Sequence, residues 1–191
     1  MDEIPKKINI SGTTNRYKMK QLISNHNIEK ESKKRVQSEK WTFSEEYFEH
    51  SIQFKMINGI LNNNFINYDD VSKIAIQEIN RKISSYKQQD SLKKRYDETK
   101  FLTFESVINK MIECQLKCRY CSSGMNVLYD IAREMSQWSV DRIDNDLGHN
   151  IDNYHLACLD CNLKRRRRTD EKFLFTKQLN IVKQDNRDNS L

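Results

Sequence analysis

Residues 138–168 read WSVDRIDNDLGHNIDNYHLACLDCNLKRRRR, and this stretch decides the fold that the sequence predicts. The segment WSVDRI alternates apolar and polar residues, which is typical of a short strand, and YHLAC predicts a second strand that returns beside it. The turn-rich NDLGHNIDN between them predicts a loop, with Gly148 as a candidate for positive φ. From Cys161 the segment CNLKRRRRTDEKFLFTKQLNIV predicts one helix. The stretch therefore predicts a ββα unit made of strand, loop, strand and helix.

Two C-x-x-C pairs frame this unit, C-R-Y-C upstream and C-L-D-C at the start of the helix. Each pair forms a tight turn, and two such turns supply the four thiolates of a tetrahedral zinc site. The sequence predicts a structural Zn²⁺ ion with the ligands Cys118, Cys121, Cys158 and Cys161. The fifth cysteine, Cys114, lies outside the pattern on an apolar helix face, where packing is its expected role.

The composition of the 191-residue chain points to a basic protein with a modest core. Lys and Arg number 33 against 27 Asp and Glu, the formal net charge is +6, and the mean hydropathy is −0.87. The bases cluster at 33–35 and 164–168, which favours a polyanionic partner such as nucleic acid. For the first cluster alone, a solvated helix face is an equally good interpretation. One proline and four glycines argue against a sandwich or barrel that needs many tight turns.

No apolar segment of the sequence reaches transmembrane length, and the opening MDEIPKKINI lacks the apolar stretch of a signal peptide. We therefore expect an intracellular protein with reduced thiols and no membrane partner. The abundance of Asn, Lys and Ile is compatible with a viral, phage or AT-rich microbial origin.

Helical periodicity appears at residues 43–61 and 71–87, and a further helix is expected from about Thr103 as its N-cap. Residues 88–100 are either a linker or an extension of the preceding helix. The expected fold is mainly α, with a small α+β zinc-bound ββα-metal unit in the C-terminal half. We divide the chain into a helical region, 1–100, and a zinc-braced domain, 101–191. The first region binds nucleic acid, contacts a partner or braces the second.

The ββα unit brings together groups that suit phosphodiester chemistry. Asp141 ends the first strand and Asn162 opens the helix, and their oxygens are hard ligands suited to Mg²⁺ or Mn²⁺. Asn162, Arg165, Arg166 and Thr169 would share one helix face, from which the arginines reach flanking phosphates. A divalent ion held there would stabilise the leaving oxygen while a nearby base activates water.

The ordered motifs C-R-Y-C, D-R-I-D-N, G-H-N-I-D-N and C-L-D-C-N resemble the HNH (His-Me finger) nucleases, in particular the zinc-braced recombination endonuclease VII type. The resemblance covers residues 118 to about 170. It implies that Asp141 and Arg142 match the Asp-His dipeptide, Asn153 the Asn that stabilises the loop, and Asn162 the metal ligand on the helix. It also implies a DNA substrate, duplex or branched, and a homodimer as one arrangement, because junction-cleaving relatives often dimerise. The expected nucleic-acid contacts are Arg142, Lys164, Arg165, Arg166 and Arg168.

The sequence departs from the family at the general base, because Arg142 replaces the His of the dipeptide. An arginine stays protonated and does not accept a proton at ordinary pH. His149 can take over as base, Asp144 can do so or position the water, or the site is inert and only binds. We favour His149 over Asp144, since an imidazole near its free pKa is the better acceptor. For His155, on the second strand, a structural role is expected.

Three functions follow. The leading one is a metal-dependent endonuclease that hydrolyses DNA with structural Zn²⁺ and catalytic Mg²⁺ or Mn²⁺. The second is a catalytically inactive, zinc-stabilised module that binds nucleic acid. The third is a protein-interaction scaffold whose function lies in the helical half.

Overall fold

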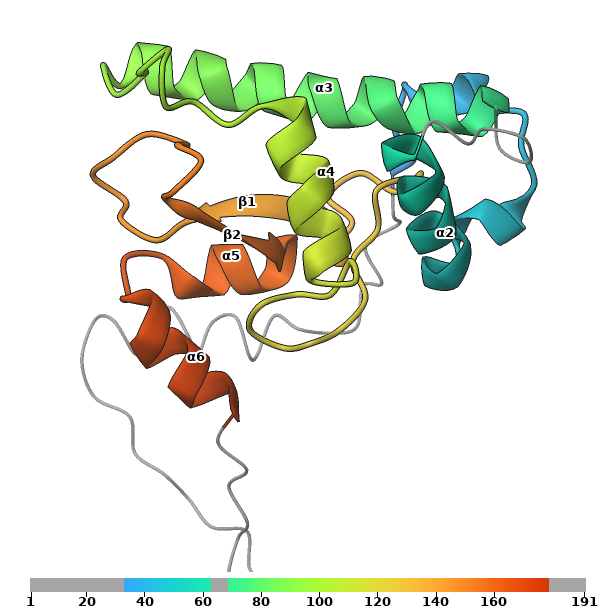
Figure 1. Cartoon of the computed structure of the whole chain (residues 1–191). Coiled ribbons are helices and arrows are strands. Elements are labelled where there is room, and N and C mark those ends of the chain that lie inside the picture. Colours follow the sequence, from blue (N-terminus) through green and yellow to red (C-terminus); the bar gives the residue numbers. More distant parts are fainter. Residues whose placement is uncertain (1–32, 63–68, 179–191) are drawn as a thin grey trace, which may run out of the picture. The chain divides into compact units, whose positions relative to one another are not determined.

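The computed structural model describes residues 33–62 and 69–178 (Figure 1). From Lys34 onward they belong to one compact unit, which contains both sides of residue 100. The segment just after that position pairs with the β1–β2 loop, since the Leu102 amide donates to the His149 carbonyl and the Ile151 amide to the Lys100 carbonyl. The boundary expected near residue 100 therefore does not separate two compact units. Among the described helices, none is long and apolar enough to cross a bilayer.

The centre of the unit is a two-stranded antiparallel hairpin of β1 (Trp138–Arg142) and β2 (Tyr154–Cys158). The register sets Trp138 opposite Cys158 and Asp141 opposite His155. Helix α5 (Leu159–Arg165) follows β2 directly and packs against both strands. In Figure 1 the hairpin lies between α3 and α5. The predicted order of strand, loop, strand and helix is confirmed.

The single helix expected from Cys161 is wrong, because α5 ends at Arg165 and α6 (Asp170–Gln178) begins five residues later. Arg166 has φ 54°, in a region that a right-handed helix cannot continue through. The guanidinium of Arg165 holds the turn by donating from Nη1 to the Arg168 carbonyl at 2.6 Å. The end of the expected helix, 179–182, lies outside the described residues.

Helices α2 (His50–Leu61) and α4 (Phe104–Glu113) supply much of the apolar core. The helix expected over 43–61 is interrupted, since the short 3-10 turn η2 (Glu45–Phe48) precedes an extended Glu49; another 3-10 turn, η1 (Ser38–Lys40), lies upstream. The N-cap predicted at Thr103 is confirmed by a capping box in which Thr103 and Ser106 satisfy each other's backbone amides. Buried side chains of both helices meet in the core: Met56, Ile57, Ile60, Val107, Ile108 and Met111.

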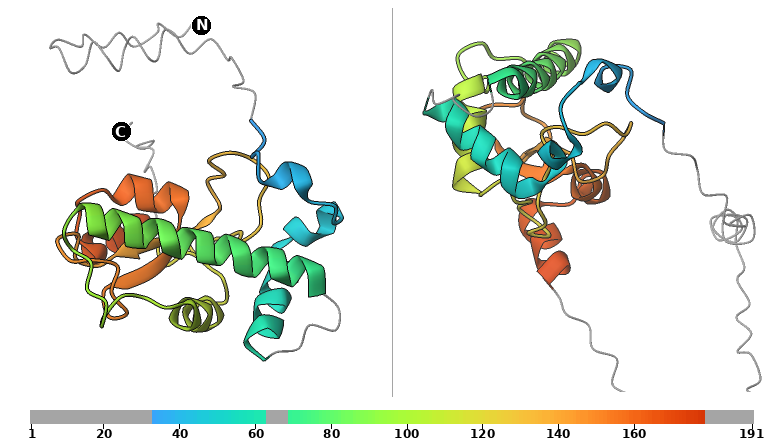
Figure 2. Two further views of the ribbon diagram at one scale, coloured as in Figure 1. Left: turned by 90° about the horizontal axis from the view of Figure 1, so that it is seen from above. Right: turned by 90° about the vertical axis from the view of Figure 1, so that its right-hand side faces the viewer.

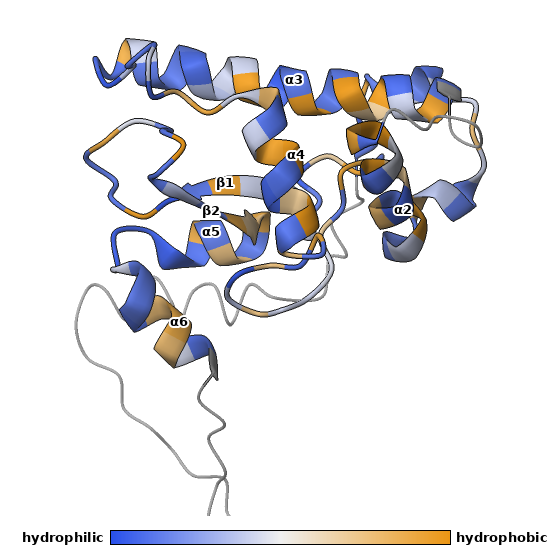
Figure 3. Cartoon of the chain, in the orientation of Figure 1, coloured by the Kyte–Doolittle hydropathy of each residue, from blue (hydrophilic) through white to orange (hydrophobic). Residues whose placement is uncertain are grey.

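Helix α3 (Asp69–Leu92) is longer than the 71–87 segment, so part of the charged stretch extends the helix. Its first half buries Val71, Ala75 and Ile79 at four-residue intervals. Figure 3 shows apolar residues concentrated in this half and mainly polar ones over the β1–β2 loop. The left-hand view of Figure 2 shows the full length of this helix from above. Helix α3 thus covers the core with one half and the hairpin loop with the other.

Close packing around Gly148, and not its backbone conformation, explains why a glycine is needed at this position. A Cβ atom there would collide with the Arg95 carbonyl oxygen and lie 3.0 Å from Oδ2 of Asp90. Its φ is outside the left-handed region, so the expected positive φ is wrong. The glycine lets the β1–β2 loop approach the end of α3.

Candidate metal centre and its acidic neighbour

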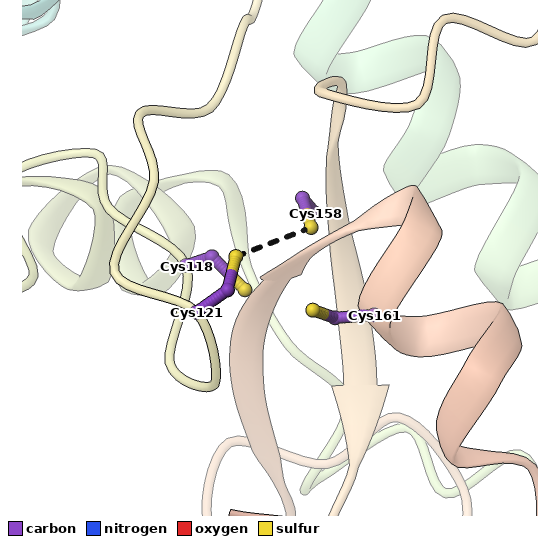
Figure 4. A group of neighbouring side chains, drawn as sticks. All are labelled: Cys118, Cys121, Cys158 and Cys161. Atoms are coloured by element: carbon purple, nitrogen blue, oxygen red, sulfur yellow. Dashed lines mark hydrogen bonds between the residues drawn. The ribbon is translucent and has the colours of Figure 1, made fainter. Parts of the chain in front are cut away.

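Four cysteine sulfurs converge where the loop after α4 meets the end of the hairpin. Cys118 and Cys121 lie on that loop, Cys158 ends β2 and Cys161 lies in the first turn of α5. All four Sγ atoms are within 4.8 Å of one another, and Cys121 and Cys158 are 3.8 Å apart. Figure 4 shows the four side chains pointing toward a common centre. Zinc–sulfur bonds of about 2.3 Å in a tetrahedron require sulfurs about 3.8 Å apart.

The chemistry of the thiols also fits a cation. A hydrogen bond from the Cys158 thiol lowers the pKa of Cys118 to about 4. Burial, together with the negative charge of Cys118, raises the pKa of Cys161 to about 12. The negative charge of one thiolate therefore makes it harder for a neighbouring thiol to lose its proton. A bound dication would offset that charge and favour the thiolate form of all four cysteines. The four cysteines can hold one zinc ion.

Asp141 lies at the far end of β1 from this cluster, and its carboxylate is buried and fully engaged. Its Oδ1 accepts from Nη2 of Arg165 at 2.9 Å, and its Oδ2 lies 2.6 Å from Nε of the same guanidinium. The second contact is a close ion pair and not a well-aligned hydrogen bond, because Nε finds no hydrogen-bond partner in the described structure. Burial raises the pKa of Asp141, and the Arg165 contact opposes that rise. A divalent ion would have to displace the guanidinium to reach this carboxylate.

Asn162 lies beside the strand that carries Asp141. Its amide Nδ2 donates to the Ser139 hydroxyl at 3.0 Å and to the Val140 carbonyl at 3.1 Å. The two expected Mg²⁺ or Mn²⁺ ligands are thus on neighbouring elements, α5 and β1. In this arrangement Asn162 fastens the helix to the strand.

His149, the expected replacement for the missing base, lies against α3. Its Nδ1 is 2.8 Å from Oδ1 of Asp90, its ring stacks on Tyr86 at 4.6 Å, and the residue is 4% exposed. Burial lowers the pKa of the imidazole, and the Asp90 carboxylate opposes that change. The ring stacks on Tyr86 and one ring nitrogen contacts Asp90, so His149 takes part in packing the loop against α3.

The remaining loop residues hold the loop itself. Asn153 accepts from the Asp144 amide at 2.8 Å and donates to the carbonyls of Asp144 and Gly148, the bonds expected of a loop-stabilising amide. The exposed Asp144 accepts from the Asp146 amide at 2.8 Å. Arg142 donates to the Leu147 carbonyl at 2.9 Å, so its guanidinium spans the loop.

The arginine run does not form one helix face, because α5 ends inside it. Arg165 is 0% exposed, which removes it from the expected phosphate contacts. Arg166 and Arg168 line an open groove between α5 and α6, whereas Arg167 lines a second hollow beside the β1–β2 loop. Lys164 is exposed and pairs with Asp160 at 2.7 Å. The turn after α5 therefore directs one arginine inward and the others toward solvent.

A proton-sharing cluster next to Asp141 escaped the sequence analysis. The Tyr120 hydroxyl lies 2.5 Å from Oδ2 of Asp141 and 2.7 Å from Oδ1 of Asp170, and His155 Nε2 is 3.4 Å from the other Asp170 oxygen. The single hydroxyl proton of Tyr120 therefore faces oxygens of two different carboxyl groups. No signal in the sequence marked Tyr120 or Asp170, and the register that sets His155 opposite Asp141 is seen only in the structure.

Comparison with known proteins finds no match of this chain to a protein-family model, to a curated protein or to a solved structure.

Proposed function

We propose that this chain is a zinc-stabilised module that binds nucleic acid. One observation carries the proposal. The first arginine after the C-L-D-C-N motif, Arg165, forms an ion pair with Asp141 at the end of β1, and the next three arginines face solvent. Arg165 neutralises Asp141 in the interior, whereas Arg166, Arg167 and Arg168 are exposed. The ββα unit thus presents positive charge where an HNH nuclease would hold a catalytic cation.

The identity of residue 142 supports binding without cleavage. A guanidinium in the position of the family's base cannot accept a proton from water. His149 is packed under α3, and the Asp141 carboxylate is saturated by Arg165 and Tyr120. In the binding function, a strand of DNA would be held by phosphate contacts alone.

The test is a binding assay on the zinc-loaded protein with a labelled DNA duplex, repeated over a range of salt concentrations. Affinity should fall steeply with salt, because each phosphate contact releases counterions. The double change Arg166→Gln and Arg167→Gln should lower the salt slope by about two. Lys93→Gln, which removes an exposed charge beyond the end of α3, is the control and should leave the slope unchanged. If the protein binds no DNA even at low salt, the proposal is wrong.

The second candidate is a metal-dependent endonuclease that hydrolyses DNA, and the Tyr120–Asp170–His155 cluster favours it. His155 lies directly across the hairpin from Asp141, and its side chain is 23% exposed, so water can reach it. Burial lowers the pKa of His155, which keeps the imidazole neutral and able to accept a proton. In this function His155 would be the base, and Asp141 and Asn162 would hold Mg²⁺ or Mn²⁺, which requires the Arg165 guanidinium to leave the Asp141 carboxylate.

A nicking assay separates the two functions. Supercoiled plasmid and branched DNA are incubated with the protein in Mg²⁺ or Mn²⁺, beside His155→Ala and Asn162→Ala. The binding function predicts intact DNA with every protein. Nicking that disappears in both variants, while their DNA binding is retained, would replace the first proposal with the second.

A further inference from the structure

An open groove of about 880 Å³ lies between α5 and α6. Its walls come from the end of α5, the turn at Arg166 and one side of α6, and Met135 from the segment before β1 closes it. This volume is within the range of sites that bind a small molecule or part of a larger one. Neither the zinc cluster nor Asp141 lines it.

The charge of the groove is strongly one-sided. Its basic residues are Lys164, Arg166, Arg168 and Lys177, and its only lining carboxylate, Asp160, is already paired with Lys164. Lys177 and Arg168 both lie over the ring of Phe173, at 5.8 and 4.9 Å from its centroid. Such a rim recognises an anion, and its cations on both sides of the groove suit a chain of phosphates.

The floor of the same groove is apolar and open to water. Met135 is 44% exposed and Leu163 is 47% exposed, and the buried Phe173 lies beside them. Duplex DNA offers phosphates and sugars at its surface and keeps its base faces stacked. It would therefore leave the apolar side chains of the groove floor exposed to water. An unpaired base has two free apolar faces, and one of them can cover Leu163 and Met135 while phosphates meet the rim.

We propose that the groove between α5 and α6 binds single-stranded DNA, with bases against Met135 and Leu163 and phosphates at Arg166 and Lys177. The inference rests on the proposed nucleic-acid function and specifies its substrate. The backbone supports it, since the positive φ at Arg166 is where the chain turns that residue into the groove. The unit would then grip DNA where its strands are separated.

The experiment compares the affinity of the zinc-loaded full chain for a labelled oligothymidylate of about 15 nucleotides and for a duplex of equal length at one salt concentration. The single strand should bind at least about fivefold more tightly, because it adds base contacts to phosphate contacts. Changing Met135 and Leu163 together to Ser should weaken single-strand binding about tenfold and leave duplex binding within about twofold. Both side chains are substantially exposed, so this variant is expected to fold, and its zinc content and circular dichroism check that it has done so.

Two charge variants locate the phosphates. Lys177→Gln should weaken single-strand binding, whereas Lys172→Gln, on the same helix but outside the groove, should not. Equal affinity for single strand and duplex, or loss of both in the Met135 and Leu163 variant, overturns the groove inference and leaves the nucleic-acid function standing. Failure to bind any DNA overturns the proposed function itself. Binding of poly-glutamate or anionic lipid vesicles in place of oligonucleotide would assign the groove to another partner and reject the inference.

Discussion

Arg165 is the residue that determines what the acidic end of β1 can do. Its side chain is fully buried, its Nη2 donates to Asp141, and its Nη1 donates to the Arg168 carbonyl. It also donates to the Arg142 carbonyl. One guanidinium thus neutralises a buried carboxylate and fixes the turn that ends α5. Arginine suits this role better than lysine, since it offers several donors in a rigid plane.

Arg165→Ala should strongly destabilise the protein. It leaves the carboxylate of Asp141 buried with no cationic partner, and removing one partner of a buried ion pair typically costs about 3–5 kcal/mol. Urea unfolding of the zinc-loaded protein measures the change. The neighbouring Arg166→Ala, which alters an exposed side chain, should change the free energy of unfolding by about 0.5 kcal/mol or less. A loss in Arg165→Ala as small as that of the control would show that the ion pair contributes nothing to stability.

At the scale of elements, α3 docks onto the hairpin through three polar side chains at four-residue spacing. Lys82 donates to the Trp138 carbonyl, the Tyr86 hydroxyl accepts from the Val140 amide, and Asp90 holds His149. The spacing puts all three on one face of the helix. This face continues the line of Val71, Ala75 and Ile79 that packs on the core, so a single helix face changes from apolar to polar as it passes from core to hairpin.

Lys82 makes the stability of this contact depend on pH. Burial lowers the pKa of Lys82 to about 7, and the lysine also lies over the rings of Tyr129 and Trp138. In the unfolded chain its pKa is about 10.4. Below pH 7 both states carry the proton and the cost of burying the charge is fully present. Between about pH 7 and pH 10 the unfolded state binds more protons, so the contribution of Lys82 to the free energy of unfolding rises with pH.

The comparison is between wild type and Lys82→Met, unfolded in urea at pH 7, 8 and 9. The stability of wild type relative to the variant should rise over this series, because only wild type has the proton to release. Lys93→Met, at an exposed lysine just after α3, should run parallel to wild type. A difference between wild type and Lys82→Met that is the same at all three values would contradict the lowered pKa.

The hairpin was predictable from sequence because its signals are local. Strand alternation, the turn-rich loop and the C-x-x-C spacing lie within a short stretch, and the structure confirms both strands and the convergence of the four cysteines. The N-cap at Thr103 was likewise predictable, since the hydrogen bonds of a capping box join residues only three positions apart.

Contacts between distant residues were not predictable in the same way. The partner of His149 is Asp90, and the partner of Asp141 lies beyond the cysteine motif at Arg165. The sequence predicted that 161–182 would be one helix, but α5 ends at Arg165, whose guanidinium pairs with Asp141 on β1. The burial of His149 and Arg165 could not be predicted, because burial depends on which element packs over a side chain, and no local pattern encodes that.

At the scale of the whole molecule, the four-cysteine cluster joins two segments that are distant in the sequence. It ties the loop after α4 to the junction of β2 and α5. A hydrophobic core is modest in a chain with a mean hydropathy of −0.87, so a metal link should contribute much of the stability of this corner.

Elemental analysis of the purified protein should find one zinc ion per chain, bound by the single four-cysteine cluster of the described residues. Cys118→Ser should lower that content and the midpoint of thermal unfolding, because a hydroxyl is a poor zinc ligand. Cys114→Ser is the matched control, since its sulfur lies outside the cluster, and should keep the full zinc content. A protein that carries no zinc yet unfolds at the same temperature with and without a chelator would exclude a structural metal.

The packing of α2 and α3 on the C-terminal half predicts how fragments of the chain behave. A fragment of residues 34–191 keeps the whole compact unit, whereas 101–191 loses Tyr86 and Asp90 from the hairpin and exposes the apolar face of α4 that α2 covers. Its cysteines are all present, so the shorter fragment should still bind zinc. Without its covering helices it should show no cooperative thermal unfolding and little protection of the Leu102 and Ile151 amides from hydrogen exchange, while 34–191 shows both. Cooperative unfolding of 101–191 at the midpoint of the longer fragment would mean that the zinc-held unit folds independently and that α3 only rests on its surface.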